Sequence, residues 1–130
     1  MTEFPLAPDL PLALHWVNAA PLRIAAMRGR LVALVFWHAG SATSANAIAD
    51  MGFLQAKYAD GLTVIGIHTP KFDAQRQEDL VARAVNRLGV RFAVASDADA
   101  VAWQHYGVRA WPSVALIDAH GRLVEIIAGD

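Results

Sequence analysis

Residues 31–44 read LVALVFWHAGSATS, and this stretch decides how the chain folds. Its first half, Leu31–Trp37, is an uninterrupted apolar run rich in strand formers, which is typical of a strand covered on both faces. Its second half is rich in small and hydroxyl-bearing residues, which favour the start of a helix. The expected inward face of that helix recurs at helical spacing, as Ala47, Met51, Leu54 and Tyr58. Gly61 is placed to end the helix, so the stretch predicts a central strand followed by a helix.

Farther along, strand and helix patterns alternate. Leu62–His68 and Val90–Val94 are apolar runs expected to form two more strands. Between them, Asp73 is placed to cap a second helix that ends at Gly89. The inward face of this helix is expected to consist of Leu80, Val81, Ala84, Val85 and Leu88. This order predicts parallel strands joined by helices that cover the sheet.

The last part of the chain predicts a short helix and a β-hairpin. Asp97 is placed to open a helix that runs through Tyr106 and stops at Gly107. Val114–Ile117 and Leu123–Ile127 then flank the turn at residues 118–121. The expected fold class is therefore α/β, with a mixed central sheet flanked by helices and a C-terminal hairpin.

We expect two parts in the chain, an N-terminal extension over residues 1–28 and a main domain over residues 29–130. Three of the six prolines fall within residues 1–11, which predicts an irregular lead-in that contributes nothing to the core. Leu12–Val17 and Pro21–Arg28 are short mixed segments that favour an edge strand or a hairpin.

Composition excludes several classes of protein. The 130 residues carry 11 Lys and Arg against 12 Asp and Glu, and 55% of them are hydrophobic, which fits one globular domain. No basic run is present, so nucleic acid is not expected as a partner. The longest apolar stretch is far shorter than the roughly 20 residues of a membrane span. The first residues lack an export signal, so we expect a cytoplasmic location and no membrane partner.

Phe36-Trp37 at the end of a buried strand, together with Trp111-Pro112 before a hairpin strand, resembles the thioredoxin-like fold. Of two groups with this fold, the chain resembles the thioredoxin-like domain of NHL-repeat-containing proteins more closely than the TlpA-type thiol-disulfide oxidoreductases. Four segments carry the resemblance, which runs from about Trp16 to Gly129: residues 16–22, 29–37, 66–72 and 103–113.

The resemblance implies a Cys-x-x-Cys pair, and this chain has Ser41 and Ser44 at those positions and no cysteine at all. In thioredoxins a thiolate attacks a substrate disulfide and a second thiol resolves the intermediate. A hydroxyl performs neither step, so we expect no catalytic residue and no cofactor. Val35 replaces the family's buried acid and Ala49 its helix proline, changes that a Cys-to-Ser exchange alone would not explain.

The resemblance also implies that Trp111-Pro112 forms the family's cis-proline loop, whose backbone pairs with an extended peptide. We therefore expect a protein or peptide partner at a surface made by the loop and the helix start. The residues expected there are Trp37, His38, Gly40, Ser41, Ser44, Trp111, Pro112 and Ser113. Gly40 stands where close relatives often carry another cysteine.

Other interpretations remain open. The main alternative is a thiol-disulfide oxidoreductase family member acting in cell redox homeostasis. A Ser/His nucleophile or an anion site near Ser41 competes with plain helix capping, which we favour because Ser and Thr are preferred at helix starts. The five histidines show no metal-ligand spacing, so no metal site is expected. The family's final helix is not evident before Asp130, which would leave part of a sheet face bare and predicts a homodimer or a protein partner.

Overall fold

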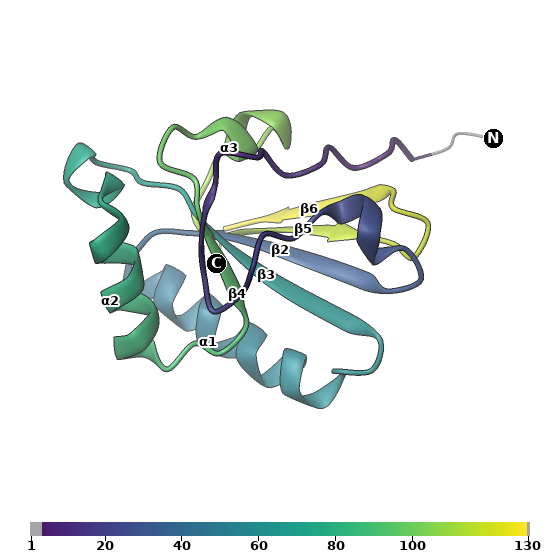
Figure 1. The fold of residues 1–130 in the computed structure, drawn as a ribbon, viewed down its shortest axis with the longest axis horizontal. Helices are drawn as coiled ribbons and strands as arrows, with labels where there is room; N and C mark the ends of the chain where they lie inside the picture. Colours follow the sequence, from purple (N-terminus) through teal and green to yellow (C-terminus); the bar gives the residue numbers. More distant parts are fainter. Residues whose placement is uncertain (1–3, 130) are drawn as a thin grey trace.

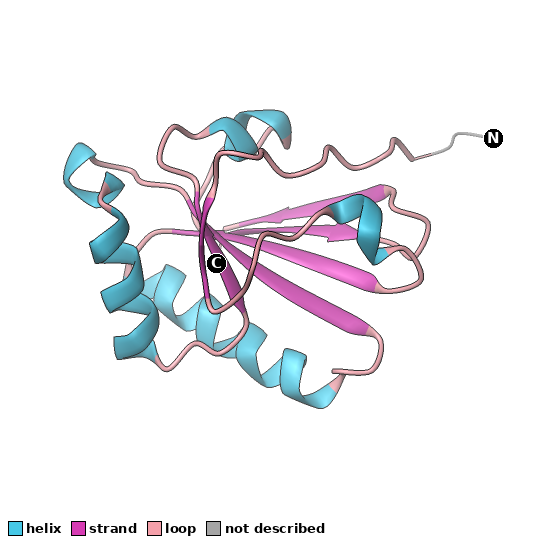
Figure 2. Ribbon diagram, in the orientation of Figure 1, coloured by secondary structure: helices cyan, strands magenta, loops and turns pink. Residues whose placement is uncertain are grey.

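The computed structural model describes residues 4–129 as one mixed sheet with helices on both faces (Figures 1 and 2). The strands are β1 (His15–Val17), β2 (Leu31–Trp37), β3 (Leu62–His68), β4 (Ala93–Ser96), β5 (Ser113–Ile117) and β6 (Leu123–Ala128). The α-helices are α1 (Ala42–Lys57), α2 (Glu78–Leu88) and α3 (Val101–His105), and the 3-10 helices are η1 (Ile24–Met27) and η2 (Asp73–Arg76).

The sheet order is β1-β4-β3-β2-β5-β6, with β2, β3 and β4 parallel. β5 runs antiparallel to β2, and β6 pairs with β5 as the predicted C-terminal hairpin. β2 lies in the middle of the sheet, where six of its seven residues are buried, as its apolar run predicts. The α/β class, the mixed sheet and its flanking helices are thus confirmed.

Two apolar cores lie on the two faces of the sheet. On one face, α1 and α2 cover a cluster that includes Val35, Trp37 and Ile48. On the other face, α3, η1 and the lead-in cover a cluster that includes Phe36 and Tyr106. The alternation of Val35, Phe36 and Trp37 between the two clusters follows from the period of a strand.

The N-terminal part contributes more to the core than predicted. β1 is an edge strand antiparallel to β4, as expected for Leu12–Val17, but the Pro21–Arg28 segment contains η1 rather than a hairpin strand. Leu10 is buried, so the expectation of no core within residues 1–11 is wrong. Leu10 is held in the core because the Asp9 carboxylate accepts hydrogen bonds from the amides of Leu10 and Ile24, which fasten the lead-in to η1.

α1 forms where predicted but buries a different face. Its buried residues are Ser44 and Ile48, whereas Leu54 and Tyr58 of the predicted inward stripe are 40% and 50% exposed. Apolar residues lie almost all round this helix, so periodicity alone does not fix its orientation. The orientation follows instead from the packing of Ile48 in the apolar cluster with Val35 and Val64, which turns the Ser44–Ile48 side toward the sheet.

Two boundaries in the second half of the chain were predicted wrongly. Asp73 begins η2 and does not cap α2, which starts after Gln77 without a side-chain cap. The third strand is Ala93–Ser96 rather than Val90–Val94, because the Asn18 side chain takes the carbonyls of Val90 and Phe92 out of the ladder.

The α1 side of the hairpin is only partly covered. Val114 and Leu116 of β5 are half-buried there, and Ile127 of β6 is 49% exposed. Among residues 4–129, no helix has both the length and the hydrophobicity that a bilayer span requires.

Candidate functional site

The predicted site residues come from two segments that the sheet brings together. β2 ends at Trp37 beside the start of β5, because Phe36 and Ser113 are register partners. The loop before β5 therefore lies beside the turn that leads into α1. The rings of His38 and Trp111 meet edge to face at 5.4 Å, which joins the two segments directly.

Ser41 and Ser44 act as helix-start residues. The Ser41 hydroxyl accepts a hydrogen bond from the Ser44 amide at 3.2 Å, which is an N-cap contact. Ser44 is fully buried, and its hydroxyl accepts from the His38 amide at 3.4 Å. Neither hydroxyl bonds to an imidazole or a carboxylate within residues 4–129, so the geometry supports capping over a Ser/His nucleophile.

His38 is held as a hydrogen-bond acceptor. Its Nδ1 accepts from the Gly40 amide at 3.2 Å and lies 3.3 Å from Nε2 of Gln75. Burial, and then the charge of Lys71, lowers the pKa of His38 below its ordinary value. A neutral ring fits the acceptor role and the apolar surroundings.

Gln75 is a site residue that the sequence did not indicate. Its carbonyl oxygen accepts from the amides of Lys71 and Phe72, while its amide nitrogen reaches the His38 ring. Gln75 is 9% exposed. A Cβ atom at position 40 would lie only 2.5 Å from Nε2 of Gln75, so a residue larger than glycine would collide with it. A polar residue in a polar segment carries no periodic signal of burial.

His68, at the end of β3, holds the turn between β2 and α1 in place. Its Nε2 accepts a hydrogen bond from the Ala39 amide at 3.0 Å, which gives His68 a structural role. Burial, and then the neighbouring His38, lowers the pKa of His68 to about 4. Its ring packs edge to face on Trp37 at 4.9 Å, and Nδ1 of His68 and Nε1 of Trp37 are buried without a hydrogen-bond partner in the described part of the chain.

The Trp111 loop presents backbone beside the helix start. The Trp111–Pro112 bond is cis, and the Trp111 ring stacks on Trp103 at 4.1 Å. Its Nε1 donates to the carbonyl of Thr69 at 2.8 Å, which fixes the side chain. Within the part of the chain that the structure describes, the backbone N–H and C=O of Trp111 make no hydrogen bond.

Most of the other predicted binding residues are not at the surface. Those that are buried are Trp37, His38, Ser44, Pro112 and Ser113. Pro112 accepts from the Gly129 amide, and the Ser113 hydroxyl donates to the Ala110 carbonyl at 2.6 Å. The accessible part consists of Gly40, Ser41 and Trp111, which we call the loop–helix surface.

Behind this surface, Asp97 anchors the end of β4. It accepts hydrogen bonds from the Thr69 hydroxyl and from the amides of Ala102 and Trp103 in the first turn of α3, although the helix begins at Val101 and not at Asp97 as predicted. Burial raises the pKa of Asp97, although these donors act in the opposite direction. Asp97 thus holds Thr69 and Trp103, the two residues that contact the Trp111 side chain, and is itself buried.

A small hollow of about 260 Å³ adjoins the loop–helix surface at Gly40. Arg83 and Arg87, one turn apart on α2, line it together with Gln75. Neither guanidinium has an ion-pair or hydrogen-bond partner among the described residues. Over residues 4–129, no group of His, Asp and Glu has the arrangement of a metal site.

The chain is similar in sequence to one domain of several larger proteins. It is 34% identical over 125 residues to Protein SUPPRESSOR OF QUENCHING 1, chloroplastic, from Arabidopsis thaliana, covering 95% of this chain and 12% of that protein. It is 34% identical over 128 residues to Protein DipZ from Mycobacterium bovis, and 28% identical over 127 residues to human NHL repeat-containing protein 2. Each of these two alignments covers 95% of this chain and 18% of the relative.

Solved structures share the fold. A thioredoxin-like protein in its oxidized form superposes with a TM-score of 0.88 at 18% identity, over 98% of this chain and 86% of that one. A thiol-disulfide isomerase from Corynebacterium glutamicum gives a TM-score of 0.84 at 22% identity, over 95% and 87%. The fold is therefore thioredoxin-like. The Redoxin family model matches residues 6–130, and the chain belongs to the Redoxin family as a thioredoxin-like domain without cysteine.

Proposed function

We propose that this domain binds an extended segment of a partner protein at the loop–helix surface and does not exchange electrons with it. The observation that carries the proposal is the backbone of Trp111 beside the Ser41 cap, whose N–H and C=O are both without a hydrogen-bond partner among residues 4–129. An extended chain satisfies such groups by pairing as an added strand. The cytoplasmic location expected from the sequence stays a prediction.

The chemistry of the helix start supports the redox-inactive part of the proposal. Disulfide exchange requires a thiolate, and the chain contains no sulfur except that of its methionines. The alternative, thiol-disulfide exchange typical of the family's cysteine-bearing members, would require catalysis by Ser41 or Ser44. An insulin reduction assay with dithiothreitol separates the two, because turnover above buffer would contradict our proposal.

The charge beside the surface indicates the chemistry of the partner. The guanidinium groups of Arg83 and Arg87 stand at helical i, i+4 spacing, which is unfavourable for like charges, and Lys71 lies close to His38. A carboxylate of a bound segment would neutralise this cluster next to Gly40. We therefore expect the partner segment to be extended and acidic.

The test selects short linear peptides from a phage-displayed library and titrates the best clone into isotopically labelled protein. We expect enriched acidic clones that shift the amide signals of Ser41, Trp111 and Ser113. Arg83→Gln with Arg87→Gln should weaken binding by about tenfold and reduce its salt dependence. Tyr58→Ala, a change on the far end of α1, serves as the control and should leave the affinity unchanged. Selected clones that leave the Ser41 and Trp111 signals unmoved would contradict the proposal.

A further inference from the structure

The outer face of α1 is unusually poor in charge for an exposed helix. Over 16 residues it carries only Asp50 and Lys57, and Phe53 on the same side is 75% exposed. By contrast, the 11 residues of α2 include two acidic and two basic side chains. A helix that is apolar on most of its sides is normally covered by another surface.

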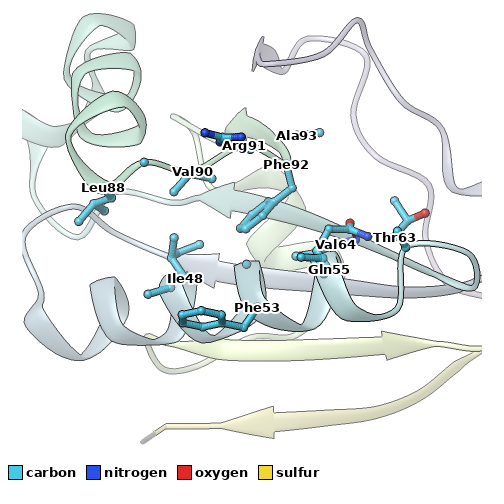
Figure 3. Close-up of a pocket in the computed structure, with 15 residues that line it drawn as sticks. Ile48, Phe53, Gln55, Thr63, Val64, Leu88, Val90, Arg91, Phe92 and Ala93 are labelled. Atoms are coloured by element: carbon cyan, nitrogen blue, oxygen red, sulfur yellow. Dashed lines mark hydrogen bonds between the residues drawn. The ribbon is translucent and has the colours of Figure 1, made fainter.

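An apolar groove of about 700 Å³ runs along this face of α1 (Figure 3). Its α1 wall is shallow because Ala49, Gly52 and Ala56 have little or no side chain. The opposite wall is formed by Leu88 and the residues that lead into β4. Phe53 lies on α1 at the border of the groove. This face therefore has both an exposed aromatic side chain and, next to it, a hollow large enough to hold one.

The two charges of α1 are placed symmetrically about Phe53. Asp50 lies three residues before it and Lys57 four residues after it, so all three share one stripe of the helix and all three are exposed. The Lys57 ammonium lies 5.4 Å from the centroid of the neighbouring Tyr58 ring, and no acidic group among the described residues forms an ion pair with it. Two copies of this helix placed antiparallel bring Asp50 of each opposite Lys57 of the other.

We propose that a second copy of this chain docks on α1, with the two α1 helices antiparallel about a two-fold axis near Phe53. Each Phe53 then enters the groove of the partner along its small residues, and two ion pairs fix the register. A two-fold interface must be self-complementary, and this face offers both the anchor and the hollow. The charge order excludes a parallel arrangement, which would set like charges together.

This arrangement leaves the loop–helix surface open. Ser41 lies 12 residues before Phe53, so the start of α1 extends about 18 Å from the axis, whereas the helix end extends only about 6 Å beyond it. The partner's α1 therefore covers the second half of the helix and not its beginning. Self-association is independent of the proposed peptide binding, and failure of one does not decide the other.

Sedimentation velocity of the full chain from micromolar to near-millimolar concentration tests the proposal. We expect a concentration-dependent dimer, with Phe53→Asp raising its dissociation constant by about tenfold or more. Phe53 is exposed in one copy, so this variant should keep the fold, which circular dichroism checks. Ile127→Asp changes an exposed apolar residue on the hairpin face instead and should leave the dimer intact.

Charge exchange tests the register. Asp50→Lys and Lys57→Asp should each weaken the dimer, and the double variant should restore it because the pairs re-form with reversed signs. A monomer at every concentration would overturn the proposal. A dimer lost in Ile127→Asp but kept in Phe53→Asp would overturn it in favour of the hairpin face, and a double variant weaker than both single ones would overturn the antiparallel register.

Discussion

At the scale of single residues, the site is defined by imidazoles held neutral. His68 accepts the Ala39 amide from below the turn and His38 accepts the Gly40 amide within it. Both rings have pKa values lowered by burial, so each presents an acceptor at neutral pH. The turn before α1 therefore depends on two lone pairs that protonation would remove.

His68 predicts a dependence of stability on pH. Its pKa is about 4 in the folded chain and 6.5 in the unfolded one, so the unfolded chain binds more protons in this interval and stability falls as pH falls through it. Each pKa unit corresponds to about 1.4 kcal/mol, so the loss reaches about 3 kcal/mol. Urea unfolding from pH 7 to pH 4 measures it.

The matched variant is His68→Asn, whose side-chain oxygen can still accept a hydrogen bond but does not titrate. Its stability should vary less over the same interval than that of the parent chain. Asp97, with a raised pKa, opposes the trend in both proteins and cancels from the comparison. Identical pH profiles in the two would contradict the assignment.

At the scale of elements, α1 completes the edge of β3. β3 begins at Leu62, but its pairing with β4 begins only at Ile65. The backbone groups of the residues before Ile65 therefore have no partner in β4 on that side. The Gln55 side chain takes the place of the missing peptide group: it donates to the Leu62 carbonyl and accepts from the Val64 amide, each at 2.6 Å. Arg30 also donates to the Leu62 carbonyl, at 3.2 Å.

Gln55→Leu should destabilise the fold by about 1–3 kcal/mol, because the buried Val64 amide then loses its acceptor. The Leu62 carbonyl keeps its hydrogen bond from Arg30, whereas the Val64 amide loses its hydrogen bond. The Val64 amide should therefore exchange with solvent faster than its neighbours. Gln104→Leu on α3 replaces an exposed glutamine without a side-chain bond among the described residues, and should change stability by less than about 0.5 kcal/mol. Equal denaturation midpoints for the two variants would count against this role.

The same elements explain what the sequence could predict. Strands buried on both faces, such as β2 and β3, have an unambiguous apolar pattern, and the Asp118–Gly121 turn marks the hairpin. The orientation of α1 could not be predicted, because it depends on the packing of Ile48 against Val35 and Val64, which are distant in the sequence. Gln75 was missed for a similar reason: burial of a polar side chain by a distant loop leaves no periodic trace.

At the scale of the whole molecule, the lead-in closes one face of the sheet. It lies along the start of β6 at one end, and Asp9 joins its other end to η1 through the Ile24 amide and the Arg23 guanidinium. The Tyr106 hydroxyl donates to the Pro8 carbonyl, which ties α3 to the same segment. Burial would raise the pKa of Asp9, but the amides that donate to it and the Arg23 guanidinium outweigh burial and hold the pKa below its ordinary value.

Asp9→Ala should therefore lower the free energy of unfolding by roughly 1–3 kcal/mol at neutral pH, because the Ile24 amide loses its acceptor. The folded-state pKa is depressed, so this contribution is present above pH 3.8 and is lost as the pH falls through the folded value. Asp60→Ala, an exposed change without a side-chain bond among the described residues, is the control. A stability gap between the two variants that persists undiminished in acid would contradict the electrostatic part of this explanation.

The lead-in also limits pairing of the outer edge of β6 with a further strand. Pro5 accepts from the Leu123 amide and Ala7 donates to the Gly121 carbonyl, so a short bridge lies along the beginning of this strand. Pro5 and Pro8 flank the bridge and have no amide hydrogen to offer to a further strand. Fibril-like growth by addition of a further strand is thereby hindered at the start of this edge, where the lead-in already occupies the positions that an added chain would need.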